Sequence, residues 1–122
     1  EVKSISDRVT KTLVESTKGL ASSQSGTNMI SMNRAQYFHN ALNNTTSYRE
    51  IQNDIGIDNG DMLYNINMSL YNTDGSLYLD GTGEVVLNSG PKIPQSTNIA
   101  QTIRVVYVSQ DDSIAMLYVR VW

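Results

Sequence analysis

The chain has 122 residues, a net charge of −3 and no cysteine. Without cysteine it has no disulfides, no thiolate metal site and no thiol nucleophile. Its nine basic residues are scattered, which argues against a surface that tracks nucleic-acid phosphates, because such binding needs clustered Lys and Arg. The sequence holds no run of about 18 apolar residues, so we expect no membrane span within it.

The first twenty residues carry apolar side chains at spacings of three and four. This pattern is typical of an amphipathic helix that lays one face on a sheet. Val9, Leu13 and Leu20 mark the apolar stripe, and we expect Leu13→Asp to unfold the domain. Residues 1–20 are predicted to be the lower half of a longer N-terminal helix, which ends where the polar run 21–27 begins.

Residues 28–56 are expected to form a helical connection between the first helix and a sheet. A helix is predicted over residues 34–43, with Asn33 as its N-cap. A second short helix is predicted through residues 48–55, because Ser47-Tyr-Arg-Glu50 has the spacing of a capping box.

Residues 61–122 are expected to form an antiparallel sheet of four to five strands. Apolar and polar residues alternate from Met62 to Tyr71, so this strand should bury one face and expose the other to solvent. The turn 72–75 predicts a hairpin, with a return arm over 76–80 and a further short strand over 84–87.

The last stretch, residues 99–122, predicts a β-hairpin rich in β-branched and aromatic residues. Its second arm is apolar on both faces, and we therefore place it near the centre of the sheet and expect cover on both faces. The order of helices followed by antiparallel strands defines an α+β fold class. We expect residues 1–122 to form a single soluble domain.

Candidate chemistry is sparse. The single histidine, His39, would have to serve any Ser-His-Asp or His-metal site, and we expect it to be structural or surface-exposed instead. Acidic residues fall where turns are expected, which favours turn chemistry over metal binding: Asp58, Asp61, Asp74, Asp111 and Asp112. A pair of carboxylates acting as acid and base stays open, although nothing in the sequence marks one. We therefore predict no catalytic, cofactor-binding or metal-binding residues.

Three asparagines fit the N-glycosylation acceptor pattern: Asn43, Asn44 and Asn67. They fall in an expected loop and on the wet face of the first strand. Glycosylation at these positions would agree with a surface-exposed protein.

The layout of the whole chain resembles the soluble part of a type IV pilin-like protein, in particular the archaeal pilin-like and pseudopilin proteins. The resemblance rests on a start inside an amphipathic helix, a short helical connection, acceptor sequons and a final strand such as Leu117-Tyr-Val-Arg-Val-Trp122. It implies a hydrophobic half-helix upstream of Glu1 that anchors the full-length protein in the membrane and packs in a filament core. It further implies a cell-surface location, with other pilin-like subunits or envelope proteins as partners.

Three classes of function remain in contention. The first is a non-enzymatic structural subunit of a pilus-like or secretion-type assembly. The second is a soluble extracellular binding or adhesion module for a glycan or an envelope protein, which would use the wet strand face around Asn65, Asn67 and Tyr71. A small enzyme is the third class and the least favoured, because one histidine and no cysteine leave few arrangements of nucleophile and base.

Overall fold

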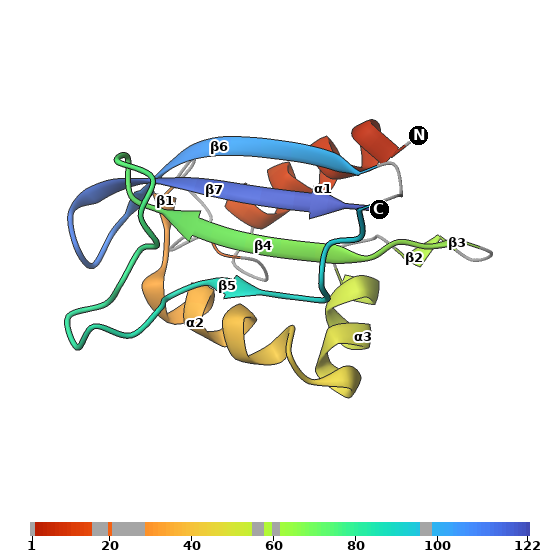
Figure 1. The fold of residues 1–122 in the computed structure, drawn as a ribbon, viewed down its shortest axis with the longest axis horizontal. Helices are drawn as coiled ribbons and strands as arrows, with labels where there is room; N and C mark the ends of the chain where they lie inside the picture. The colour runs from red at the N-terminus through yellow and green to blue at the C-terminus, as the bar shows by residue number, and fades with distance from the viewer. Residues whose placement is uncertain (1, 16–19, 21–28, 55–57, 60–61, 96–98) are drawn as a thin grey trace.

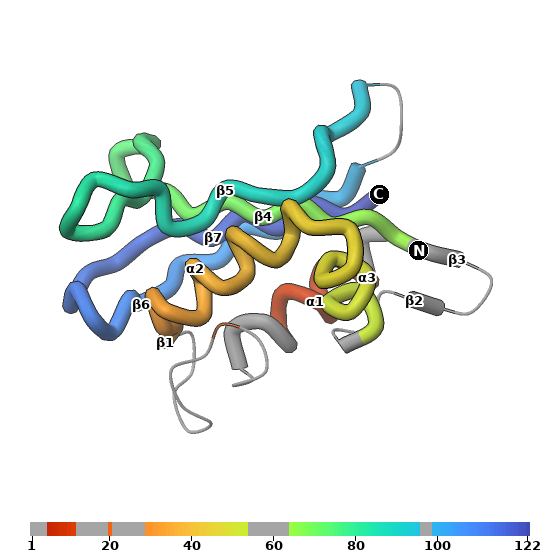
Figure 2. The backbone as a smooth tube through the Cα atoms, turned by 90° about the horizontal axis from the view of Figure 1, so that it is seen from below, coloured from red at the N-terminus to blue at the C-terminus, as the bar shows by residue number. Residues whose placement is uncertain are grey.

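A computed structural model describes the backbone of residues 2–15, 20, 29–54, 58–59, 62–95 and 99–122. Side chains are described for these residues except 2–4, 12–15, 54, 58–59 and 62–63. The fold is α+β, as predicted, with helices gathered on one side of a curled sheet (Figures 1 and 2). Among the described residues, no helix is long and apolar enough to cross a membrane.

The described residues form three helices, which precede most of the strands: α1 (Val2–Glu15), α2 (Met32–Ala41) and α3 (Thr45–Asp54). The predicted caps are wrong by two to three residues. Ser31 caps α2, because its hydroxyl accepts the Arg34 N–H at 3.3 Å. Asn44 directly precedes α3, and its Oδ1 accepts the N–H groups of Thr46 and Ser47 at 3.0 and 3.3 Å. In both cases a short polar side chain one residue ahead of the helix satisfies N–H groups that the helix itself leaves unpaired.

The main sheet has five strands in the order β1-β6-β7-β4-β5. The long strands are β4 (Ile66–Tyr71), β6 (Ala100–Val108) and β7 (Ser113–Val121), and the edges are β1 (Met29–Ile30) and β5 (Asn88–Ser89). The predicted C-terminal hairpin is confirmed, since β6 and β7 pair antiparallel over their whole length. Its second arm is central, as expected, because β7 also pairs with β4.

Other strand predictions need correction. The sheet is mixed and not purely antiparallel, because β1, inside the expected helical connection 28–56, pairs parallel to β6. The expected strands over 76–80 and 84–87 form only isolated bridges, Tyr71 with Leu77 and Leu79 with Val85. The strand predicted from Met62 to Tyr71 is split into β4 and the short β3 (Met62–Leu63), which pairs in a separate ribbon with β2 (Asp58–Asn59).

The core lies between the helices and one face of the sheet. Ile5 and Val9 of α1, Phe38 of α2 and Leu117 of β7 are buried in one cluster. Leu20, on the predicted stripe, is also buried, whereas the side chain of Leu13 lies outside the described residues. Figure 1 shows α1 running behind β6 and β7, with α2 and α3 along the β5 side.

A buried chain of hydroxyls also joins α1 to β6. Thr102 Oγ1 donates to the Asp7 carboxylate at 2.9 Å, so the 2.7 Å bond between Ser6 and Thr102 must use the Ser6 proton. Thr10 Oγ1 donates to the Ser6 carbonyl at 2.7 Å. These bonds allow the polar residues on the sheet-facing side of α1 to be buried without leaving an unpaired hydroxyl.

The second face of the sheet differs from the expectation. Along β7 the residues Ala115, Leu117, Val119 and Val121 face the helices and are fully buried, but Ile114 on the other face is 55 % exposed. Met116 and Tyr118 on that face are half-buried. The expectation of cover on both faces is therefore wrong for the chain by itself, and an apolar sheet face remains open to solvent.

Candidate functional site

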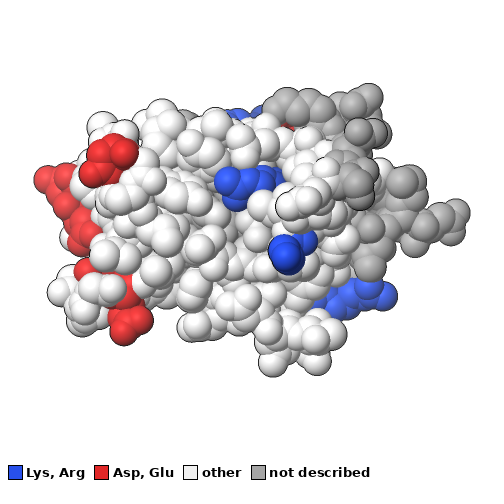
Figure 3. Space-filling model, viewed as in Figure 1, with Lys and Arg blue, Asp and Glu red and all other residues white. Residues whose placement is uncertain are grey.

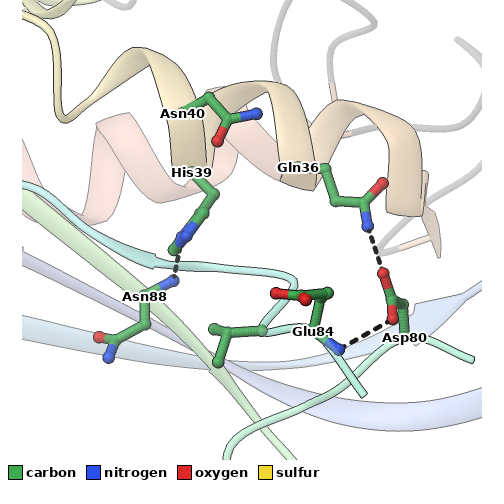
Figure 4. Close-up of a pocket in the computed structure, with 7 residues that line it drawn as sticks. Gln36, His39, Asn40, Asp80, Glu84 and Asn88 are labelled. Carbon is green, nitrogen blue, oxygen red and sulfur yellow. Dashed lines mark hydrogen bonds between the residues drawn. The ribbon is translucent and has the colours of Figure 1, made fainter. Parts of the chain in front are cut away.

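A polar cleft of about 530 Å³ lies between α2 and the segment that leads into β5. On α2 its lining comes from Gln36, His39 and Asn40, whose spacing of three and four residues places them on one side of the helix. The opposite wall is formed by Asp80, Glu84, Val85 and Asn88. Figure 4 shows His39 and Gln36 pointing from the helix toward this wall.

Asp80 organises the wall of the cleft. Its Oδ1 accepts the Thr82 N–H, the Thr82 hydroxyl and the Glu84 N–H at 2.8, 2.7 and 3.0 Å. Its Oδ2 accepts Gln36 Nε2 at 3.0 Å, which joins the loop to α2 (Figure 4). The Thr82 hydroxyl bond is the largest of the effects that hold the pKa of Asp80 below its ordinary value of 3.8, followed by the two backbone N–H groups.

His39 docks α2 onto β5. Its Nδ1 accepts the Asn88 N–H at 3.1 Å, and its carbonyl accepts the Ser89 hydroxyl at 2.6 Å. This is a structural contact of the kind expected from the sequence. With Nδ1 engaged by the Asn88 N–H, Nε2 is the ring nitrogen that remains for a further hydrogen bond.

The cleft is lined mainly by side chains that form hydrogen bonds. A general acid near neutral pH needs a carboxyl group with a raised pKa, and the pKa of Asp80 is shifted the other way. Among the described residues no group of three His, Cys, Asp or Glu side chains is placed to hold a metal ion. What the cleft offers is amide and imidazole donors from Gln36 and His39 beside the carboxylates of Asp80 and Glu84.

The three candidate glycosylation residues do not lie together. Asn43 and Asn44 are exposed in the turn between α2 and α3, where Asn43 Nδ2 donates to the His39 carbonyl at 3.2 Å. Asn67 lies in β4, and its amide donates to the Pro91 carbonyl at 3.2 Å and accepts from Arg120 at 3.3 Å. Because an N-glycan is attached through Nδ2, it would disturb the bond to the Pro91 carbonyl on Asn67 and the bond to the His39 carbonyl on Asn43.

Turn chemistry accounts for Asp74, whereas the carboxylate of Asp111 is bound by a residue distant in the sequence. Asp74 Oδ1 accepts the N–H and the hydroxyl of Ser76, at 2.9 and 2.6 Å, as expected for an Asx turn. Asp111 accepts the hydroxyl of Tyr78 at 2.6 Å. The side chains of Asp58 and Asp61 lie outside the described residues.

Sequence reasoning missed the cleft residues Gln36, Asp80 and Glu84. One signal was available: Asp80-Gly-Thr82 is a sequence in which a carboxylate readily accepts the N–H two residues on. The spacing of Gln36, His39 and Asn40 was also visible. Nothing local to the sequence indicates that these two segments face each other.

We expect the loss of thermal stability at acidic pH to depend on Asp80. Because its pKa is lowered in the folded protein, its contribution is present above the unfolded value of about 3.8 and is lost as the pH falls through the folded pKa. A carboxyl-carbon NMR titration should place the Asp80 midpoint below 3.8. In Asp80→Asn the fall of Tm between about pH 5 and pH 2 should be shallower than in the parent. An Asp80 midpoint at or above the ordinary value would contradict the arrangement around this carboxylate.

Fold and site together define an α+β domain with a mixed five-stranded sheet, one helix-covered face and a polar cleft. The chain belongs to the family of unknown function DUF7287, whose model matches residues 1–122. No curated protein and no solved structure matches the chain.

Proposed function

We propose that this domain is a non-enzymatic structural subunit of a type IV pilus-like or secretion-type surface assembly. In this proposal the full-length protein is anchored in the membrane by an apolar helix upstream of Glu1, and the domain faces the cell exterior. Its partners are other pilin-like subunits or envelope proteins.

The observation that carries the proposal is the placement of α1. This helix lays Ile5 and Val9 on the sheet behind β6 and β7, and it contacts both strands. In Figure 1 the N-terminal end of α1 lies at the same edge of the domain as the C-terminus and points away from its body. An upstream continuation of α1 would leave the domain along the helix axis, which is the geometry that an anchoring or filament-core helix requires.

The surface fraction of the native source tests this proposal. Cells are sheared, and the shed material is pelleted at high speed and probed with an antibody against the domain. We expect the protein in the pellet with shed surface assemblies, and no signal from a strain that lacks its gene. Protein found only in the soluble intracellular fraction would contradict the proposal.

The polar cleft supports a second candidate, an extracellular binding module. Its paired donors and carboxylates suit a ligand rich in hydroxyl groups, such as a glycan, which both donates and accepts hydrogen bonds. In this case an oligosaccharide should raise Tm in a concentration-dependent way, and Gln36→Ala should weaken the effect. A glycan panel that leaves Tm unchanged would remove this candidate.

A further inference from the structure

The open face of the sheet carries a continuous apolar patch across β6 and β7. Ile103, Val105 and Ile114 are 45, 55 and 55 % exposed. Val105 pairs with Met116 and Ile103 with Tyr118, so these side chains stand next to one another on one face. Exposed apolar residues that are contiguous, unlike scattered ones, mark an interaction surface.

The β4 side extends this patch. Tyr71 pairs with Met116 across β4 and β7, and its ring meets that of Tyr118 edge to face with centroids 5.0 Å apart. A hollow of about 250 Å³ opens here, lined in part by these three residues. The patch therefore spans three strands, and its surface is uneven. Exposed aliphatic side chains on β6 lie beside a depression next to β4.

Charges of opposite sign lie at the two ends of this face. The acidic end holds Asp111 and Asp112, in the turn between β6 and β7, and Asp74, in the loop that follows β4. Toward the other end, Arg120 lies between Asn67 and Gln101 of the neighbouring strands, and Lys92 follows Pro91, which bonds to Asn67. Figure 3 views this face, with red side chains at one end, a broad uncharged centre, and blue side chains from the middle toward the other end.

Arg120 is held on the open face by three neighbouring side chains. Its Nε donates to Gln101 at 2.8 Å, and its Nη1 donates to Asn67 and Ser69 at 3.3 Å. These three acceptors are uncharged. The guanidinium is thus held in place on the open face, where a carboxylate from outside would add a charged acceptor.

We propose that this face binds a second copy of the chain, face to face, about a two-fold axis that passes near Met116. Arg120 lies four residues beyond Met116 in β7, about 13 Å from the axis at roughly 3.3 Å per residue, and Asp112 lies in the turn just before the opposite end of this strand. A two-fold rotation then brings Asp112 of one copy to Arg120 of the other, twice, and stacks the apolar centres. Such an isologous contact needs a surface complementary to itself, and a face acidic at one end and basic at the other has this property. The pairing goes beyond the proposed function and does not depend on it.

The first part of the test concerns the apolar centre. Sedimentation of the wild-type protein from about 1 μM to 1 mM should show a monomer-dimer equilibrium. Val105→Asp should raise the dissociation constant at least tenfold. Tyr37→Asp is the matched control, because Tyr37 is 49 % exposed on α2 and away from this face, and it should leave association unchanged. A wild-type protein that stays monomeric throughout, or equal effects of the two variants, would overturn the proposal.

The second part identifies the partner and the register. Arg120→Glu and Asp112→Lys should each raise the dissociation constant at least tenfold, because each places like charges opposite one another twice. A one-to-one mixture should associate again, since the two altered residues then face each other. Asp112 has a φ of +53°, so circular dichroism and Tm must first show that Asp112→Lys is folded, and Asp112→Asn provides a milder variant that tolerates this backbone. Failure of the mixture to associate, with both variants folded, would overturn the two-fold arrangement whether or not the protein belongs to a surface assembly.

Discussion

Val9→Asp is expected to unfold the domain or to lower its Tm by at least about 10 °C. Val9 is fully buried between α1 and the sheet, and a carboxylate there would be desolvated without a partner at a cost of about 3–5 kcal/mol. That is a large share of the 5–15 kcal/mol that typically stabilises a domain. The measurement is thermal unfolding by circular dichroism at neutral pH.

Lys11→Asp is the matched control for this substitution. Lys11 lies two residues further along the same helix and is exposed, so the same new carboxylate should change stability by less than about 0.5 kcal/mol. Equal melting of the two variants would show that α1 does not pack on the sheet through Val9. The observation that carries the proposed function would then be lost.

Gly90→Ala is the second substitution with a large expected effect. Gly90 has a φ of +119°, and a Cβ added there would lie 2.6 Å from the Ile66 carbonyl oxygen and 2.9 Å from the Asn67 Cα. Both contacts are with the backbone of β4, which cannot move aside as the end of a flexible side chain could. We expect destabilisation of about 2–4 kcal/mol, from the backbone strain and the steric overlap together.

Gly75→Ala separates these two contributions. Gly75 also has a positive φ, +93°, but nothing lies within 4 Å of its added Cβ. It should therefore show the cost of the backbone conformation alone, about 1 kcal/mol. If both variants lose the same stability, the close approach of the segment after β5 to β4 is wrong.

The parts of the fold that could be predicted are those in which one residue pattern runs unbroken over many positions. The hairpin of β6 and β7 was found because its β-branched and aromatic residues continue over two arms of nine residues each. β1 was missed because two residues, Met29 and Ile30, cannot display a period. Its parallel pairing with β6 joins positions almost eighty residues apart, which no local signal records.

The open face shows why an inference about burial can fail when the pattern itself is correctly identified. Ile114, Met116 and Tyr118 are apolar, and a strand that is apolar on both faces is usually covered on both faces. In the part of the chain that the structure describes, the cover comes from helices on one side of the sheet. The cleft was missed for another reason, because Gln36 and Asp80 meet only through the docking of α2 beside β5.

The central claim is most directly tested by intact mass and N-terminal sequencing of the native protein, recovered from the surface fraction of its source. The proposal predicts a mature chain that extends upstream of Glu1 by about 20 apolar residues, the length that spans a bilayer as a helix. A native chain that begins near Glu1, with no lipid-soluble segment, would contradict it and would leave the binding module as the better account.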